Sequence, residues 1–191
     1  MNEININTKF NIKKLFLVGF MATGKTTIGR RLSSKLHLPF YDSDKEIEMH
    51  LKCSINEYFK SHGESKFREI EEKIIIDKIN SNQNAGFIMS LGGGSFLSNN
   101  IRLLIKSVGI SIWLNGDIDI VYNRIIKSKN ERPLALIYNK KKKLEKLLKE
   151  RVFYYEKADI KVDIIKTSKD TMADIILKKL NNHLSLNNDQ N

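Results

Sequence analysis

A glycine-rich segment near the start of the chain limits the possible folds more than any other feature. Residues 19–30 read GFMATGKTTIGR and contain the pattern GxxxxGK[ST]. The segment follows the apolar run LFLV at 15–18 and precedes apolar residues spaced four apart, so it joins a predicted strand to a predicted helix. In such a loop, backbone N–H groups and the positive end of the helix surround a phosphate. The pattern therefore predicts a phosphate-binding loop in an α/β domain.

The residue types of this loop indicate a nucleotide triphosphate with a metal ion. We expect Lys25 to reach the β- and γ-phosphates of ATP, and the hydroxyl of Thr26 to ligate Mg²⁺. The residues expected to contact the nucleotide are Ala22, Thr23, Gly24, Lys25, Thr26 and Thr27.

Short apolar runs alternate with helical patterns along the rest of the chain. Runs that read as strands lie at 38–42, 87–91, 110–114 and 160–165. Residues 54–57, SINE, form a capping box that opens a helix, and Gly63 can end that helix. This alternation predicts a three-layer P-loop fold, with a central parallel sheet of about five strands flanked by helices. Because the 191 residues contain no linker, we expect a single domain.

Composition and charge exclude several other classes of protein. The single cysteine, Cys53, excludes an internal disulfide, and no apolar run approaches the length of a membrane span. The net charge of +11 comes mostly from dispersed lysines. The densest run, Lys140 to Lys143, lacks interleaved aromatics and predicts a solvated helix face rather than a nucleic-acid patch. We expect a cytoplasmic monomer that has neither a nucleic-acid nor a membrane partner.

Two aspartates follow the second predicted strand, at the edge where open α/β sheets bind ligands. One carboxylate, Asp42 or Asp44, could hold Mg²⁺ through water, while the other could accept hydrogen bonds from the acceptor's hydroxyls or take its proton. Alternatively, Asp44 only caps a helix that starts at Lys45. The residues leave both interpretations open.

Three arginines indicate the kind of acceptor. Arg68, Arg132 and Arg151 could each be a surface ion pair, but arginine also binds carboxylates and phosphates through two hydrogen bonds at once. Together with the phosphate loop and the two aspartates, they predict an acceptor that carries both an anionic group and hydroxyls. The strand at 87–91 lacks a terminal acidic residue and no guanine-recognition motif is present, which favours a small-molecule or nucleotide kinase.

The order of these motifs resembles the shikimate kinase family, which has the nucleoside-monophosphate-kinase fold, over about residues 13–180. The matching segments are GFMATGKTTIGR, FYDSD, GESKFREIEE, SLGGGS, ERPLAL and the R-x3-Y element of RVFYYEKAD. The resemblance implies transfer of the γ-phosphate of ATP to the 3-hydroxyl of shikimate, in the pathway to chorismate and the aromatic amino acids.

The resemblance also implies roles on the acceptor side. Asp44 is similar to the family's hydroxyl-binding aspartate, and Arg68 and Arg151 to the arginines that hold the shikimate carboxylate. Glu71 resembles the glutamate that orients Arg68. Within the run Gly92, Gly93 and Gly94, Gly93 matches a backbone N–H donor to shikimate.

On the nucleotide side, Asp42 resembles the carboxylate near Mg²⁺, and Arg132 the arginine of a mobile lid over the phosphates, which we expect at about 129–142. Arg124 resembles an arginine that stacks on adenine, although its distance to Arg132 is one residue longer than usual. Ala22 stands where the family usually has glycine. The resemblance thus implies that the catalytic residues are Lys25, Asp44 and Arg132.

Two alternative functions were weighed. A kinase of the same fold could act on gluconate or a nucleoside monophosphate, but the DSD segment, the triple glycine and the paired arginines argue against both. A nucleotide-binding regulator could have lost phosphoryl transfer, but the intact Lys25, Asp44 and Arg132 argue against that loss.

Overall fold

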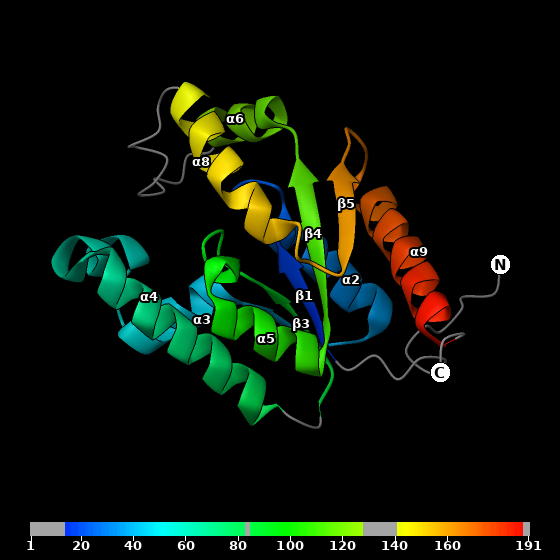
Figure 1. Ribbon diagram of the computed structural model, residues 1–191, viewed down its shortest axis with the longest axis horizontal. Helices are drawn as coiled ribbons and strands as arrows, with labels where there is room; N and C mark the ends of the chain where they lie inside the picture. The colour runs from blue at the N-terminus through cyan, green and yellow to red at the C-terminus, as the bar shows by residue number, and fades with distance from the viewer. Residues whose placement is uncertain (1–13, 83–84, 128–140, 189–191) are drawn as a thin grey trace.

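A computed structural model of the chain describes residues 14–82, 85–127 and 141–188. The strands form one parallel sheet in the order β2-β3-β1-β4-β5 (Figure 1). Their bounds are β1 (Lys14–Val18), β2 (Phe40–Asp42), β3 (Phe87–Ser90), β4 (Ile110–Gly116) and β5 (Ile160–Ile164). The predicted five-stranded parallel sheet is therefore confirmed, and each predicted apolar run contains a strand.

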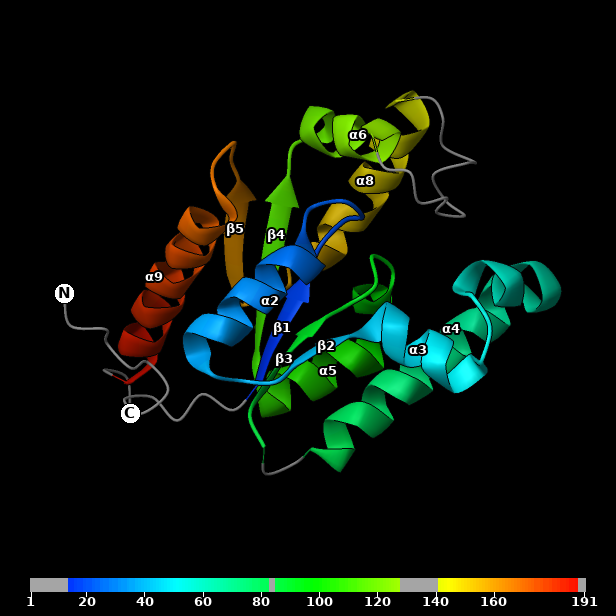
Figure 2. The same ribbon diagram turned by 180° about the vertical axis from the view of Figure 1, so that it is seen from behind.

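Helices cover both faces of the sheet, which confirms the three layers. Helices α2 (Lys25–Leu36) and α9 (Lys169–Asn188) lie on one face (Figure 2). Helices α4 (Ile55–Ser81), α5 (Asn99–Val108) and α8 (Lys141–Tyr155) pack on the other (Figure 1). The remaining elements are α3 (Ser43–Leu51), the 3₁₀ turn η1 (Ser95–Leu97) and α6 (Ile118–Lys127).

The central strand β1 explains why its sequence is continuously apolar. Leu15 and Leu17 pack against α2 and α9, whereas Phe16 and Val18 pack against α4, α5 and α8. A parallel strand buried on both faces gains from apolar side chains at every position. This double burial fixes the point at which the phosphate-binding loop leaves the sheet.

Two helix boundaries behave as the sequence predicts. Ser54 Oγ accepts the Glu57 N–H at 3.2 Å, and a carboxylate oxygen of Glu57 accepts the Ser54 N–H at 2.8 Å, so the capping box is confirmed. At Gly63 the backbone leaves the helical conformation (φ 79°, ψ 177°), and α4 bends there before it continues. Gly63 thus ends the first helical stretch, as predicted.

The lysine run also has the predicted character where it is described. Helix α8 begins at Lys141. Lys142 and Lys143 are exposed, whereas Leu144 is fully buried in the hydrophobic core. The apolar side of the helix therefore faces the core, and these lysines face the solvent.

Replacing Ser54 with alanine should destabilise the fold by about 1 kcal/mol, because the cap satisfies backbone donors at the start of α4. The hydrogen bonds from Ser54 lower the pKa of Glu57 below its ordinary value of 4.5. A lowered carboxyl pKa stabilises the fold above that value, and the contribution is lost as the pH falls through the folded-state pKa. Urea unfolding should therefore show a difference between wild type and S54A at neutral pH that shrinks in acid.

The control is Ser61→Ala, because Ser61 Oγ donates to the Glu57 carbonyl within the same helix and caps nothing. An S61A loss as large as that of S54A would contradict the capping interpretation.

Candidate active site

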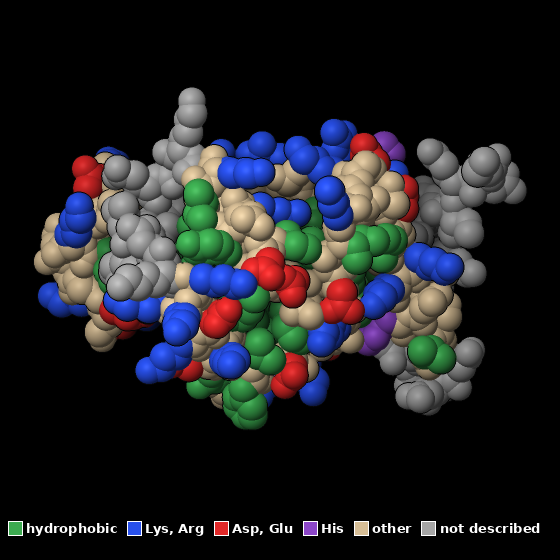
Figure 3. All heavy atoms as spheres, turned by 90° about the horizontal axis from the view of Figure 1, so that it is seen from above, with side chains coloured by type: hydrophobic (Ala, Val, Ile, Leu, Met, Phe, Trp, Pro, Cys, Tyr) green, Lys and Arg blue, Asp and Glu red, His purple; other side chains and the backbone are tan. Residues whose placement is uncertain are grey.

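Three loops meet where the strands end. The phosphate-binding loop follows β1, the segment Asp42–Asp44 spans the junction of β2 with α3, and the run Gly92–Gly94 follows β3. They line an open cleft of about 940 Å³. Figure 3 looks down on this edge and shows acidic side chains near the middle of the face, with lysines and arginines around them. The sequence motifs that were predicted to act together are therefore brought together.

The backbone of the phosphate-binding loop needs glycine at both ends. Gly19 has φ 132° and Gly24 has φ 95°, in the region that favours glycine. A Cβ on Gly19 would also lie 2.6 Å from the Leu114 carbonyl oxygen. Ala22 adopts φ 59°, so this loop holds an alanine in a left-handed conformation that costs L residues energy.

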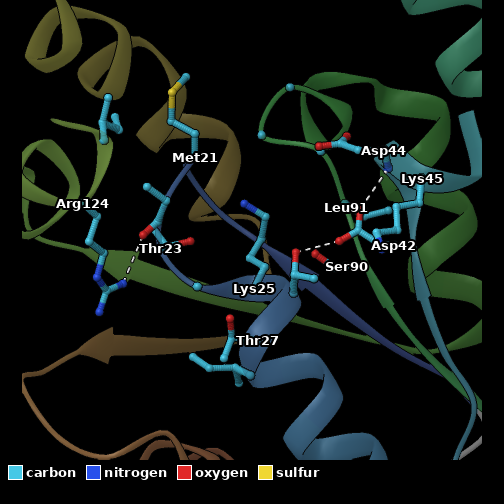
Figure 4. A pocket seen from close by; sticks show the side chains of 18 of the residues that line it. Met21, Thr23, Lys25, Thr27, Asp42, Asp44, Lys45, Ser90, Leu91 and Arg124 are labelled. Carbon is cyan, nitrogen blue, oxygen red and sulfur yellow. Dashed lines mark hydrogen bonds between the residues drawn. The ribbon is translucent and has the colours of Figure 1, made fainter. Parts of the chain in front are cut away.

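Lys25 lies at the start of α2, inside the curve of the loop. Its Nζ donates to the carbonyl oxygens of Gly19 at 2.9 Å and Phe20 at 2.8 Å, and only 8% of the residue is exposed. In Figure 4 Lys25 lies between Arg124 on one side and Asp42 on the other. The lysine is thus held near the place where the loop would receive a phosphate.

The two predicted metal ligands contact each other. Thr26 Oγ1 donates to Asp42 Oδ2 at 2.6 Å (Figure 4), which places hydroxyl and carboxylate oxygens side by side. Mg²⁺ prefers hard oxygen ligands and commonly takes one or two carboxylates together with substrate phosphates. The residues present therefore fit this ion, although the described part of the chain contains no cluster of three His, Cys, Asp or Glu residues that would hold a metal alone.

Helix α3 decides between the two interpretations of Asp44. The helix begins at Ser43, and Asp42 is its N-cap, accepting the Asp44 N–H at 3.2 Å. The alternative that Asp44 caps a helix starting at Lys45 is therefore wrong, because pairing of β2 with β3 extends only to Asp42 and the helix starts directly after it. Asp44 lies in the first turn and lines the cleft.

Charged side chains crowd the positions of Gly92 and Gly94. A Cβ on Gly92 would lie 2.7 Å from Asp44 Oδ1 and 3.0 Å from Glu71 Oε1, and one on Gly94 would lie 2.5 Å from Arg68 Nη1. The Gly92 N–H also donates to Ser43 Oγ at 2.8 Å. The backbone of this run thus forms the surface on which the predicted acceptor-binding side chains converge.

Arg68 is oriented by two glutamates. It donates to Glu71 at 2.6 Å and to Glu64 at 3.2 Å. Glu71 is only 3% exposed and also accepts the Ser95 hydroxyl at 2.7 Å. Burial acts to lower the pKa of Arg68, but the charge and hydrogen bond of Glu71 outweigh burial and raise it. The guanidinium therefore stays charged in the cleft.

Arg151 approaches the glycine run from α8. It is 5% exposed, and its Nη1 donates to the Gly93 carbonyl at 3.1 Å. Its buried Nε has no hydrogen-bond partner among the described residues. A buried donor without a partner is costly, and a carboxylate bound in the cleft would supply one.

Tyr155, one turn after Arg151, donates its hydroxyl to the same Gly93 carbonyl. The residue is fully buried, and burial raises the pKa of this hydroxyl to about 12 against the opposing charge of Arg151. The hydroxyl is therefore a proton donor throughout the neutral range.

The other predicted residues fall into two groups. Arg124, on α6, donates to the Ala22 carbonyl at 3.1 Å and so lies against the phosphate-binding loop (Figure 4). Arg132 lies outside the described residues, as does nearly all of the predicted lid at 129–142.

Sequence reasoning missed several residues of the site. Ser43 and Ser95 stand inside the quoted motifs DSD and SLGGGS, and Tyr155 closes the R-x3-Y element, so each had a signal in the sequence. The turn between β5 and α9 also lines the cleft, but its sequence carries no motif; its lining residues include Thr167, Ser168 and Lys169.

Comparisons with known proteins agree with one another. The model of the shikimate kinase family (SKI) matches residues 21–181. The shikimate kinase of Bartonella henselae is 37% identical over 180 residues, which cover 94% of this chain and 84% of that protein. That of Bartonella quintana is 37% identical over 172 residues, covering 90% and 80%.

Solved structures give the same result. The shikimate kinase of Acinetobacter baumannii in complex with shikimate has a TM-score of 0.82 and 31% identity, covering 90% of this chain and 94% of that one. The shikimate kinase of Aquifex aeolicus has a TM-score of 0.75 and 31% identity, covering 88% and 96%. A gluconokinase of Sinorhizobium meliloti, at a TM-score of 0.59 and 12% identity, shares the fold alone; it covers 93% of this chain and 97% of that one.

Replacing Ala22 with glycine should stabilise the protein by about 0.5–1 kcal/mol, because relief of the left-handed strain exceeds the added entropy of the unfolded chain. Urea or thermal unfolding would measure the gain. Ala173→Gly in the interior of α9 serves as the control, and it should destabilise by about 1 kcal/mol or more. A loss of stability in A22G would contradict the strain at this position.

Proposed function

This chain belongs to the shikimate kinase family, and on that basis we propose that it transfers the γ-phosphate of ATP to the 3-hydroxyl of shikimate. The products are ADP and shikimate 3-phosphate. The observation that carries the proposal is the convergence of Asp44, Arg68 and Arg151 on the glycine run beside the phosphate-binding loop. The chain is an ATP-dependent kinase. Its Asp44 carboxylate would bind the hydroxyls of a hydroxylated acid, and the two guanidinium groups would bind the acid's carboxylate.

We assign the donor side of the cleft to ATP. Backbone N–H groups of residues 22–27 would hold the phosphates, and Lys25 would exchange its bonds to the Gly19 and Phe20 carbonyls for bonds to the β- and γ-phosphates. The lysine would then offset negative charge on the phosphoryl group as it moves. Thr26 and Asp42 would hold Mg²⁺, which when bound neutralises charge on the phosphate oxygens.

We assign the acceptor side to shikimate. Arg68 and Arg151 would pair with its carboxylate, because both are charged and the Nε of Arg151 is an unpaired buried donor. Asp44 would accept hydrogen bonds from the ring hydroxyls and take the proton of the attacking one. Gly92, Gly93 and Gly94 line this side of the cleft, and the N–H groups of Gly93 and Gly94 would donate to acceptor oxygens.

Two further assignments complete the proposal. Arg132 would close over the phosphates as part of a lid that excludes water. Arg124, which contacts the loop at Ala22, would pack against the adenine. We further propose that the chain acts as a single-domain monomer in the cytoplasm, on the route to chorismate. In the described residues no helix is long and apolar enough to cross a membrane.

Two other functions make different predictions. A kinase for gluconate or a nucleoside monophosphate would share the donor side but would not need the paired arginines. A nucleotide-binding regulator without transfer would bind ATP and release no ADP when an acceptor is added. A coupled ADP-release assay with shikimate, quinate, gluconate and the monophosphates distinguishes all of these.

In that assay, shikimate should stimulate ADP release by the wild type, and Lys25→Ala should lower kcat by about 100-fold or more, because charge on the transferred group is no longer neutralised. The control is Lys35→Ala, which changes another lysine of α2 and removes its ion pair with Asp174 of α9, away from the loop. K25A activity within a few-fold of wild type, at an unchanged Tm, would rule out this role.

Arg68→Ala and Arg151→Ala should each weaken shikimate binding by about 2–5 kcal/mol, because a desolvated carboxylate would be left poorly paired. ATP binding should hardly change. Calorimetry with each ligand measures both effects, and Arg31→Ala, which breaks an exposed pair with Asp170, is the control. If ATP binding weakened as much as shikimate binding, both arginines would belong to the nucleotide side instead.

A further inference from the structure

Several backbone atoms of the glycine run form hydrogen bonds with other parts of the protein. The Gly92 N–H donates to Ser43 Oγ, and the Gly92 carbonyl accepts the Ser95 N–H at 3.2 Å. The Gly93 carbonyl accepts both Arg151 and Tyr155. Because a residue without Cβ is conformationally free, these bonds determine the directions in which the peptide groups of the run point.

The two donors to the Gly93 carbonyl differ in charge and in the number of further hydrogen bonds that they can donate. A carbonyl oxygen has two lone pairs, so it can accept Arg151 and Tyr155 together. Arg151 carries a charge and an unpaired Nε, and under the function proposed above its guanidinium turns to the acceptor's carboxylate. Tyr155 carries no charge, and its single hydroxyl hydrogen is already used. Tyr155 is therefore the donor that stays on the carbonyl when Arg151 engages the substrate.

The ring of Tyr155 is fixed by the core. It is fully buried and lies 6.0 Å, between ring centroids, from Trp113 of β4. Trp113 is paired in register with Val18, the last residue of β1 before the phosphate-binding loop. Tyr155 thus connects the glycine run, through its hydroxyl, to β4, through its ring. Strand β4 in turn pairs with β1, which leads into the phosphate-binding loop.

We propose that Tyr155 is a positioning residue of the acceptor subsite, whose hydroxyl holds the Gly93–Gly94 peptide in place. Since a trans peptide is planar, fixing the Gly93 carbonyl also fixes the Gly94 N–H, which points in the opposite direction within the same plane. The same hydrogen bond leaves Arg151 free to give its remaining donors to a carboxylate. Tyr155 acts through these two groups and does not itself touch the substrate.

Tyr155→Phe tests this inference, because the substitution removes one oxygen and keeps the buried ring. The shikimate KM should rise about 3- to 10-fold, as expected from the loss of one hydrogen bond, while the ATP KM stays within about twofold. Circular dichroism and Tm, with assays run well below Tm, verify that the variant is folded.

Two controls separate positioning from stability. Tyr154→Phe changes the neighbouring tyrosine, whose ring contacts Phe153 and the Arg102 side chain away from the glycine run. Ile105→Val loosens the same hydrophobic cluster as Tyr155 without touching the run. Both variants should keep the wild-type KM for shikimate.

The inference is overturned if Y155F leaves the shikimate KM unchanged, if it raises both KM values equally, or if I105V raises the shikimate KM as much. Failure of the proposed function itself would look different, since the wild type would then show no shikimate-dependent ADP release.

Discussion

The meeting of the phosphate-binding loop with the glycine run depends on the parallel pairing of β3 with β1. The Leu91 N–H donates to the Leu17 carbonyl at 3.0 Å, so the glycine run leaves the sheet beside the phosphate-binding loop. On the other side of β3, Asp42 is in register with Ser90. Because parallel strands need long crossovers and end at one edge, segments far apart in the sequence become neighbours there. The site is thus a consequence of strand order, and its loops need no further element to bring them together.

The second constraint is electrostatic, because the cleft holds opposite charges on a backbone that has no side chains. Asp44 and Glu71 lie close to Gly92, and Arg68 lies close to Gly94, so that a Cβ at either glycine would crowd them. Glu71 is nearly fully buried, and its charge is offset by Arg68 and by the Ser95 hydroxyl. A buried ion pair adds little net stability, because desolvation cancels much of its attraction. The benefit lies in geometry: Arg68 is held in one orientation, so less side-chain freedom remains to be lost when a carboxylate binds.

Local sequence patterns predicted most strands and helix boundaries. The start of α3 and the contacts between distant residues depend on long-range packing, so local patterns could not predict them. The strands, the capping box at Ser54 and the break at Gly63 follow from residue types within a few positions of each other. The start of α3 could not be predicted, because Asp42 and Asp44 are equally good caps and only the pairing of β2 with β3 selects Asp42. The bond from Tyr155 to Gly93 joins residues 62 positions apart, and no local pattern encodes it. The left-handed conformation of Ala22 does not follow from the residue type, and its one signal is that the family usually has glycine at this position.

Three side chains that are expected to contact the nucleotide or its metal ion donate hydrogen bonds to other groups of the protein. Lys25 donates to carbonyls within the loop, Thr26 donates to Asp42, and Arg124 donates to the Ala22 carbonyl. A nucleotide must therefore replace existing hydrogen bonds, and its net gain is the difference between bonds to charged phosphates and bonds to neutral carbonyls. The affinity for the nucleotide is therefore lower than a sum of its contacts with the protein would predict. In return, the same hydrogen bonds hold these side chains beside the loop, so that less side-chain freedom is lost when a phosphate binds.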